Sequence, residues 1–245
     1  QLPQYIQANR SLLKIPMEPP NCQAPIPYIL GTKWYMDEML HLAILQEYDY
    51  FIKLDTDVVF LHNKTIPFQL LHDMTVRRAV FAHTGEYPTS IVPPCGNGIV
   101  KAAQEFIRQQ QREEATTTRT TSPLYHRPCS SLQHPKLNRN ADLYYTNFVI
   151  GRTDYFQSPE VLQFSRFLVE YHPHGFFRYR WTDQIFWHFA LGLFLQDNFE
   201  QAVVDYSELR CAPHKNCWMS VHSYPQDRCD NGGYFVHTKA KTPPP

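Results

Sequence analysis

Residues 47–60 read EYDYFIKLDTDVVF, and this stretch determines how the rest of the chain is interpreted. The run from Tyr50 to Leu54 has the length and β-propensity of a strand buried in a mixed or parallel sheet. Asp55 and Asp57 follow at its carboxyl end, where α/β sheets usually place their ligand sites. Two hard oxygen ligands one residue apart suit Mn²⁺ or Mg²⁺, and such an ion commonly holds a diphosphate. An isolated Asp-x-Asp is also typical of a turn or a helix cap, so the rest of the chain must decide.

Composition favours one large domain spanning residues 1–245, because 43% of the residues are hydrophobic and 14% are aromatic. Lys plus Arg and Asp plus Glu both number 23, so net charge gives no indication of a nucleic-acid partner. No apolar run is long enough to span a membrane. The chain begins at Gln1 without a signal-peptide pattern, so we expect a processed or truncated product whose membrane anchor, if it has one, lies outside this sequence.

The cysteines and glycosylation sequons favour a compartment of the secretory pathway. The chain has six cysteines, an even number that permits disulfides, and none forms the Cys-x-x-Cys pair of a structural zinc site. Sequons begin at Asn9 and Asn63. Disulfides persist in oxidising compartments, so we expect a luminal protein.

Three segments break the pattern of regular structure. Residues 1–33 are proline-rich and predict an irregular, wrapping segment. Residues 108–140 are polar and threonine-rich and predict a long loop, and residues 210–245 predict a C-terminal loop bearing cysteines and histidines. Between them helical and strand patterns alternate, which predicts an α/β fold with a mixed, mostly parallel sheet. The helices and strands expected lie near 34–46, 68–72, 79–82, 99–107, 143–150, 158–168 and 182–193.

Two further stretches carry candidate substrate-binding residues. Asn147 lies in the 143–150 strand and can hydrogen-bond sugar hydroxyls, and Gly151 at its end allows close backbone approach; an ordinary core strand explains both equally well. Residues 175–184 crowd aromatics and arginines before a helix. Arg180 can pair with phosphate, and Trp181 can stack on a sugar ring.

The first turn of the helix after Trp181 contains Asp183 and Gln184. The helix dipole stabilises an acid at this position, so Asp183 has a structural explanation besides substrate contact. Near the C-terminus, His237 or alternatively His214 can complete a carboxylate-bound metal site. Lys239 can hold a leaving diphosphate.

The order of these segments resembles a GT-A-type glycosyltransferase, and more narrowly the fungal-type Golgi α-1,2-mannosyltransferase family. The resemblance covers roughly residues 30–220 apart from the 108–140 loop, and its matching segments are the helix at 34–45, Tyr48-Asp-Tyr, Asp55-Thr-Asp57-Val, Asn147-Phe148-x-Ile150-Gly151, Asp154-x-Phe156-x-Ser158, Gly175-Phe-Phe, Arg180-Trp181-x-Asp183 and Leu193-Phe-Leu.

The resemblance implies a single Rossmann-like GT-A domain and retaining, Mn²⁺-dependent transfer of a hexose, mannose first, from a nucleotide-diphosphate sugar to a glycan or glycoprotein hydroxyl. Asp55, Asp57 and His237 would hold the ion, which would act as a Lewis acid on the diphosphate. Asp183 is the candidate catalytic acid, as a substitute for a glutamate that the family has where this chain has Val149; alternatively, the mechanism needs no such group, or the donor and linkage differ. The substrate-binding residues would be Asn147, Arg180, Trp181, Gln184 and Lys239. The protein would be luminal, in the Golgi, and anchored as a type II membrane protein by a segment outside this chain.

Val149 and the short segment before Asp55 keep an alternative open. The family has Glu-Pro-Asp where this chain has Asp55-Thr-Asp57, which preserves oxygen ligands, but it also has a glutamate where this chain has Val149. Only 54 residues precede Asp55, too few for the usual nucleotide-binding βαβ half, which we expect on sequence not shown. The alternative is a catalytically inactive, transferase-like domain that binds glycans or a partner chain. A metal-dependent hydrolase ranks last, because the additional ligands of two-metal sites are missing.

Overall fold

The computed structural model describes residues 26–56, 58–60, 68–87, 98–116, 143–171, 177, 181–195, 199–206 and 219–221. The helices in these ranges are α2 (Ile26–Lys33), α3 (Phe68–Arg77), α4 (Ile99–Thr116), α5 (Thr153–Phe156), α6 (Pro159–Glu170), α8 (Asp183–Phe194) and α9 (Phe199–Ala202). Three short helical turns connect α2 to the first strand: η3 (Trp34–Glu38), η4 (Met39–His41) and η5 (Ala43–Glu47). The strands are β1 (Tyr50–Leu54), β2 (Val58–Phe60), β3 (Phe81–His83), β4 (Glu86–Tyr87), β5 (Leu143–Tyr144), β6 (Phe148–Arg152), β7 (Val203–Asp205) and β8 (Met219–Val221).

The central sheet has four strands in the order β1-β6-β3-β7. Strand β6 runs antiparallel to both β1 and β3, with Lys53 opposite Val149 and Phe81 opposite Gly151, and only β3 and β7 are parallel. Two ladders of two strands, β2-β8 and β4-β5, accompany it. The α/β class and the mixed sheet are therefore confirmed, but the expectation of mostly parallel strands is wrong for the described part of the chain. The alternation of helices and strands in the sequence indicates a layered fold. It does not determine whether a strand is parallel or antiparallel to its neighbour when a long connection separates the two, as between β3 and β6.

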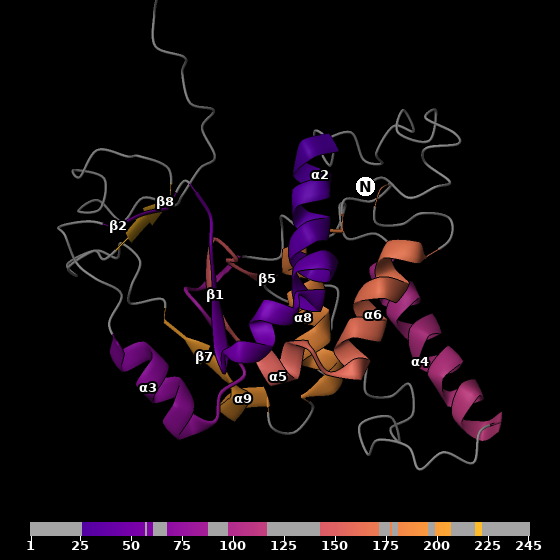
Figure 1. Ribbon diagram of the computed structural model, residues 1–245. Coiled ribbons are helices and arrows are strands. Elements are labelled where there is room, and N and C mark those ends of the chain that lie inside the picture. Colours follow the sequence, from indigo (N-terminus) through magenta and orange to yellow (C-terminus); the bar gives the residue numbers. More distant parts are fainter. Residues whose placement is uncertain are drawn as a thin grey trace, which may run out of the picture.

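Helices cover both faces of the sheet (Figure 1). On one face, α8 and α6 pack over alternate strand residues such as Phe51, Phe81 and Val149. On the other, Leu70 and Met74 of α3 pack on Ala82, Phe148 and Ile150, together with Val204. The period-2 alternation of β6 thus sends its side chains into two separate cores. The result is a three-layer α/β/α arrangement.

Helix α8 is buried almost throughout. Every residue from Ile185 to Phe194 is buried, and its Trp187 contacts Phe51, Phe81 and Phe156 with ring centroids 4.6–5.9 Å apart. A helix that is apolar all round belongs inside a core, so the sequence pattern explains this position. None of the described helices is both long enough and apolar enough to cross a membrane.

The structure corrects the boundaries of two expected irregular segments. Residues 26–33 form α2, although they were expected to be irregular, because Pro27 lies in the first helical turn, where a missing N–H leaves no hydrogen bond unmade. Helix α4 continues to Thr116 into the expected 108–140 loop, because Gln, Arg and Glu are good helix formers even when polar. Of residues 210–245, only 219–221 are described, and they form β8.

Candidate active site at the end of strand β1

The acid-bearing end of β1 lies beside the start of β6. The amide of Asp55 donates a hydrogen bond to the carbonyl of Asn147 (2.9 Å), and the amide of Val58 donates to the carbonyl of Asp55 (3.1 Å). The first bond continues the β1-β6 ladder by one residue, and the second closes a turn immediately after it. The backbone of Asp55 is therefore fixed on both sides, as a ligand position requires.

A buried lysine joins two carboxylates from distant parts of the sequence at this point. The Nζ of Lys53 lies 2.8 Å from Oδ1 of Asp55 and 3.1 Å from Oδ2 of Asp183, and it donates a hydrogen bond to the carbonyl of Thr146 (2.5 Å). The same ammonium lies 4.6 Å from the ring centroid of Tyr35, a cation–π distance. We call Asp55, Lys53 and Asp183 the acid–lysine cluster.

Burial differs sharply within the acid–lysine cluster. The side chains of Lys53 and Asp183 are 3% and 6% exposed, whereas that of Asp55 is 35% exposed. Burial lowers the pKa of Lys53, but the charges of Asp183 and Asp55, with hydrogen bonds to both, raise it by more, so the pKa lies above its ordinary value. The lysine is therefore charged at neutral pH, and Asp55 is the more exposed of the two carboxylates.

The fold explains how Asp183 reaches Lys53. Thr182 has extended backbone angles (φ −93°, ψ 170°) and Asp183 begins α8, as the sequence predicted. Its carboxylate is thus stabilised both by the helix N-terminus and by the ammonium. Neither effect requires a substrate, yet together they hold the Asp183 carboxylate in a fixed position close to Asp55.

The other described candidates lie near the acid–lysine cluster in different environments. Asn147 is 8% exposed, and its side-chain oxygen accepts a hydrogen bond from the Phe148 amide (3.2 Å). Gln184 is half-buried in the first turn of α8. Trp181 is 1% exposed and belongs to the core cluster, 5.8 Å from the ring of Tyr171, so in this arrangement it has no open face for a sugar and we assign it to the core.

Gly151 is also a core residue. A Cβ at this position would collide with the ring of Phe51 and lie 3.0 Å from Cδ2 of Phe156. The glycine is thus explained by close packing of β6 against the aromatic core rather than by close approach of a sugar.

The remaining site candidates, Asp57, Arg180, His214, His237 and Lys239, lie outside the described residues. Among the residues that are described, no group of three or more His, Cys, Asp or Glu side chains could hold a metal ion. The residue types nevertheless fit one: Asp55 offers a partly exposed hard oxygen donor at the carboxyl end of a strand. Because Lys53 is bonded to Oδ1, an ion would have to share this carboxylate with the ammonium.

Sequence reasoning missed Lys53. A signal was present, because strand alternation places Lys53 on the same face as Phe51, pointing inward, and a charged residue at an inward position requires a partner. The partner, Asp183, lies 130 residues further along the chain, and only the fold brings the two together. Val149 is directly opposite Lys53 in the β1-β6 pair and is fully buried.

The layered mixed sheet with Asp55 at the end of strand β1 has the GT-A-type fold expected from the sequence, and similarity to solved structures supports this fold. The chain is similar to core-mannan synthase A (CmsA/Ktr4) from Aspergillus fumigatus in its Mn/GDP form, with a TM-score of 0.50 and 18% identity over 72% of this chain and 45% of that one. It is also similar to the mannosyltransferase Ktr4p from S. cerevisiae, with a TM-score of 0.56 and 19% identity over 78% of this chain and 47% of that one. The complex of Ktr4p with GDP gives 0.51 and 20%, over 70% and 42%.

The chain spans less than half the length of each of these three structures. No protein-family model and no curated protein sequence matches it. The likeness is therefore one of fold, and it agrees with the family resemblance read from the sequence.

Proposed function

We propose that the chain is a glycosyltransferase domain that moves a hexose, mannose first, from a nucleotide-diphosphate sugar to a hydroxyl of a glycan or glycoprotein. The observation that carries the proposal is the acid–lysine cluster: the fold brings an exposed carboxylate, Asp55, to the end of β1 and fixes a buried one, Asp183, next to it. The similar structures support a nucleotide-sugar donor, since one is described in a Mn/GDP form and another in complex with GDP.

In this mechanism Asp55, together with Asp57 and His237 (or His214), would hold Mn²⁺ or Mg²⁺, which would supply positive charge to stabilise the leaving diphosphate. Asp183 acts near the reacting sugar, oriented by Lys53. Asn147 and Gln184 contact the substrate hydroxyls, and Arg180 and Lys239 contact the diphosphate.

The buried Val149 bears on how the reaction is completed. It fills the position of a glutamate in the resembling family, and valine can be neither a nucleophile nor a base. The ion pair that holds Asp183 beside Asp55 supports the reading in which Asp183 takes that role in a retaining reaction. We place the protein in the lumen of the secretory pathway, in the Golgi, in agreement with its cysteines and sequons.

Val149 also favours the second candidate function, a domain that has lost transfer activity and binds glycans or a partner chain. The two proposals differ in one measurable property, metal-dependent binding of a nucleotide sugar. A scaffold should show none in calorimetry with GDP- and UDP-sugars plus Mn²⁺.

The test of transfer is hydrolysis of GDP-mannose and other nucleotide sugars by the full-length protein with Mn²⁺, compared with Asp57→Ala. We expect the variant to lose at least a hundredfold in kcat, because Asp57 would be a direct metal ligand. Tyr28→Ala, an exposed substitution on α2, serves as the control and should retain wild-type turnover. Equal turnover by wild type and Asp57→Ala would exclude the proposal.

A further inference from the structure

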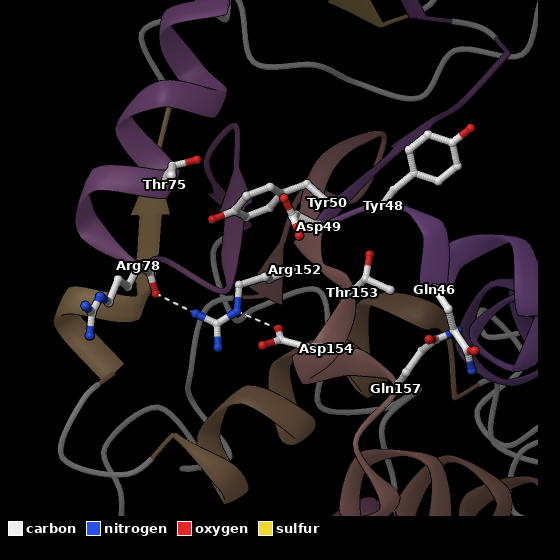
Figure 2. A pocket seen from close by; sticks show the side chains of 10 residues that line it. All are labelled: Gln46, Tyr48, Asp49, Tyr50, Thr75, Arg78, Arg152, Thr153, Asp154 and Gln157. Carbon is white, nitrogen blue, oxygen red and sulfur yellow. Dashed lines mark hydrogen bonds and ion pairs between the residues drawn. The ribbon is translucent and has the colours of Figure 1, made fainter.

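A hollow lined by polar and charged residues lies at the opposite end of β1 from Asp55. It has a volume of about 640 Å³ and is formed where the start of β1, the end of α3, the end of β6 and α5 meet (Figure 2). We call it the β1-start groove. Tyr50 in the groove lies five positions before Asp55 along the chain, about 17 Å at 3.3 Å per residue. The β1-start groove is thus separate from the acid–lysine cluster.

Hydrogen bonds between these elements give the groove a fixed shape. Arg152 donates from Nε to Oδ1 of Asp154 (2.6 Å) and from Nη1 to the carbonyl of Arg78 (2.9 Å), which ties β6 to α5 and to the end of α3. The amide of Thr153 donates to the carbonyl of Asp49 (2.9 Å). Figure 2 shows both bonds of Arg152 on one side of the groove and Gln157 on the other. This side of the groove is therefore preformed in the absence of a ligand.

The lining is polar but carries no net charge. Its charged members are two arginines, Arg78 and Arg152, and two aspartates, Asp49 and Asp154, so the formal charges cancel. A phosphate would meet the aspartates and a cation would meet the arginines. Amides, carboxylates and guanidinium groups together provide the planar donors and acceptors that pair with neutral hydroxyl groups.

One polar atom at the groove is left without a partner. Thr153 is only 4% exposed, and within the described part of the chain its hydroxyl makes no hydrogen bond. A buried hydroxyl without a partner is costly, and such a group calls for a bound water or ligand. Tyr48 at the rim is 58% exposed, so the apolar face of its ring is available for stacking.

The backbone conformation of Arg78 is a further unusual feature of the groove. Its φ is 53°, the only left-handed non-glycine residue among those described, at the position directly after α3 where glycine is preferred. The amide of Ala79 donates to the carbonyl of Met74 (2.8 Å), as in a helix-ending turn. Arginine in place of glycine here adds strain, and Arg78 is one of the residues that line the groove.

We propose that the β1-start groove binds a neutral oligosaccharide, with Tyr48 stacking on a sugar ring and the lining groups pairing with its hydroxyls. The ligand class follows from the groove itself. That this oligosaccharide is part of the glycan acceptor rests on the proposed function, and it would allow the domain to hold an acceptor away from the point of transfer.

The experiment is a titration of the full-length protein with α-1,2-linked mannotetraose, without donor or metal, followed by calorimetry and by chemical shifts. An α-1,4-linked galacturonate tetramer of similar size is the charged comparison. We expect saturable binding of the mannotetraose and at least tenfold weaker binding of the galacturonate.

Two groove variants and two controls make the result specific. Tyr48→Ala and Arg78→Gly should each weaken mannotetraose binding at least tenfold, and Arg78→Gly should not lower Tm, because glycine accepts the left-handed backbone. Tyr28→Ala, an exposed tyrosine on α2, should bind as wild type. So should Asp55→Asn, which separates groove binding from transfer.

The proposal is overturned if wild type binds no mannotetraose, if it prefers the galacturonate, or if Tyr48→Ala and Arg78→Gly bind as tightly as wild type. Groove binding without any donor turnover supports this inference and counts only against the transferase. Donor turnover without groove binding supports the transferase and contradicts this inference.

Discussion

Replacing Lys53 by methionine removes the ammonium from the acid–lysine cluster while keeping most of the side-chain volume. Asp183 is then left as a buried carboxylate, 6% exposed, without its ion-pair partner, whereas Asp55 at 35% exposure can be hydrated. Removing one partner of a buried pair costs about 3–5 kcal/mol, and an exposed pair contributes about 0–1 kcal/mol. Because methionine also avoids the cost of burying an ammonium, we expect a loss of about 3 kcal/mol in the free energy of unfolding.

The assay is chemical denaturation at pH 7 together with calorimetric Tm. At about 2–4 °C per kcal/mol for a chain of this size, the expected fall in Tm is about 6–12 °C. The double variant Lys53→Met/Asp183→Asn removes both charges, and it should be more stable than Lys53→Met by about 2 kcal/mol, since no buried charge is then left unpaired.

A matched control is Lys33→Met, at a second lysine that is largely buried. The partners of Lys33 are Glu38, at 2.6 Å and 44% exposed, and Asp37, which also contacts His41 and Ser165. No carboxylate is left alone, so this loss should stay near 1 kcal/mol. If Lys53→Met costs no more than Lys33→Met, or if the double-variant losses simply add, the reasoning about a buried charge pair is refuted.

Two other predictions concern the core. Gly151→Ala should lower the free energy of unfolding by about 1–3 kcal/mol in urea denaturation, because the added Cβ would collide with the ring of Phe51. The control is Gly31→Ala in α2, where no atom lies within 4 Å of the added Cβ, and it should raise the free energy of unfolding by about 0.5–1 kcal/mol. Equal effects of the two substitutions would contradict the packing argument. Burial raises the pKa of Tyr155, whose hydroxyl donates to the carbonyl of Ala190 (3.1 Å). The unfolded chain therefore loses this proton above about pH 10 while the folded chain keeps it, so stability should fall as pH rises past that value. Tyr155→Phe should reduce this slope between pH 9 and 11, and an unchanged slope would count against the assignment.

The sequence predicted the parts of the fold that depend on local chemistry. The apolar run before Asp55 is β1, and helix α6 begins at Ser158-Pro159, where proline at the first helical position is favourable. Helix α8 begins at Asp183 after Thr182, at the position that the sequence indicated, although the Thr182 side chain makes no capping hydrogen bond. Each of these signals lies within a few residues of the structure that it specifies.

What the sequence did not reveal depends on contacts between distant residues. The antiparallel direction of β6 is a property of the long connection after β3, and no local pattern encodes it. The pairing of Lys53 with Asp183 requires both the register of β1 and the position of α8. Trp181 has an aromatic side chain of the kind that stacks on sugar rings, but tertiary packing buries it. The expected metal ligands Asp57 and His237 stay predictions.

Strand β1 and helix α8 are joined at two points with matching spacing. Phe51 and Lys53 are two residues apart on the strand, about 6.6 Å, and Trp187 and Asp183 are four residues apart on the helix, about 6 Å. Phe51 contacts Trp187 and Lys53 contacts Asp183, so the two elements run in opposite directions with one apolar and one ionic attachment. A change in the aromatic contact that slides the helix would carry the Asp183 carboxylate with it. The position of that acid beside Asp55 is therefore determined deep in the core, where the Trp187 indole packs against the rings of Phe51, Phe81 and Phe156.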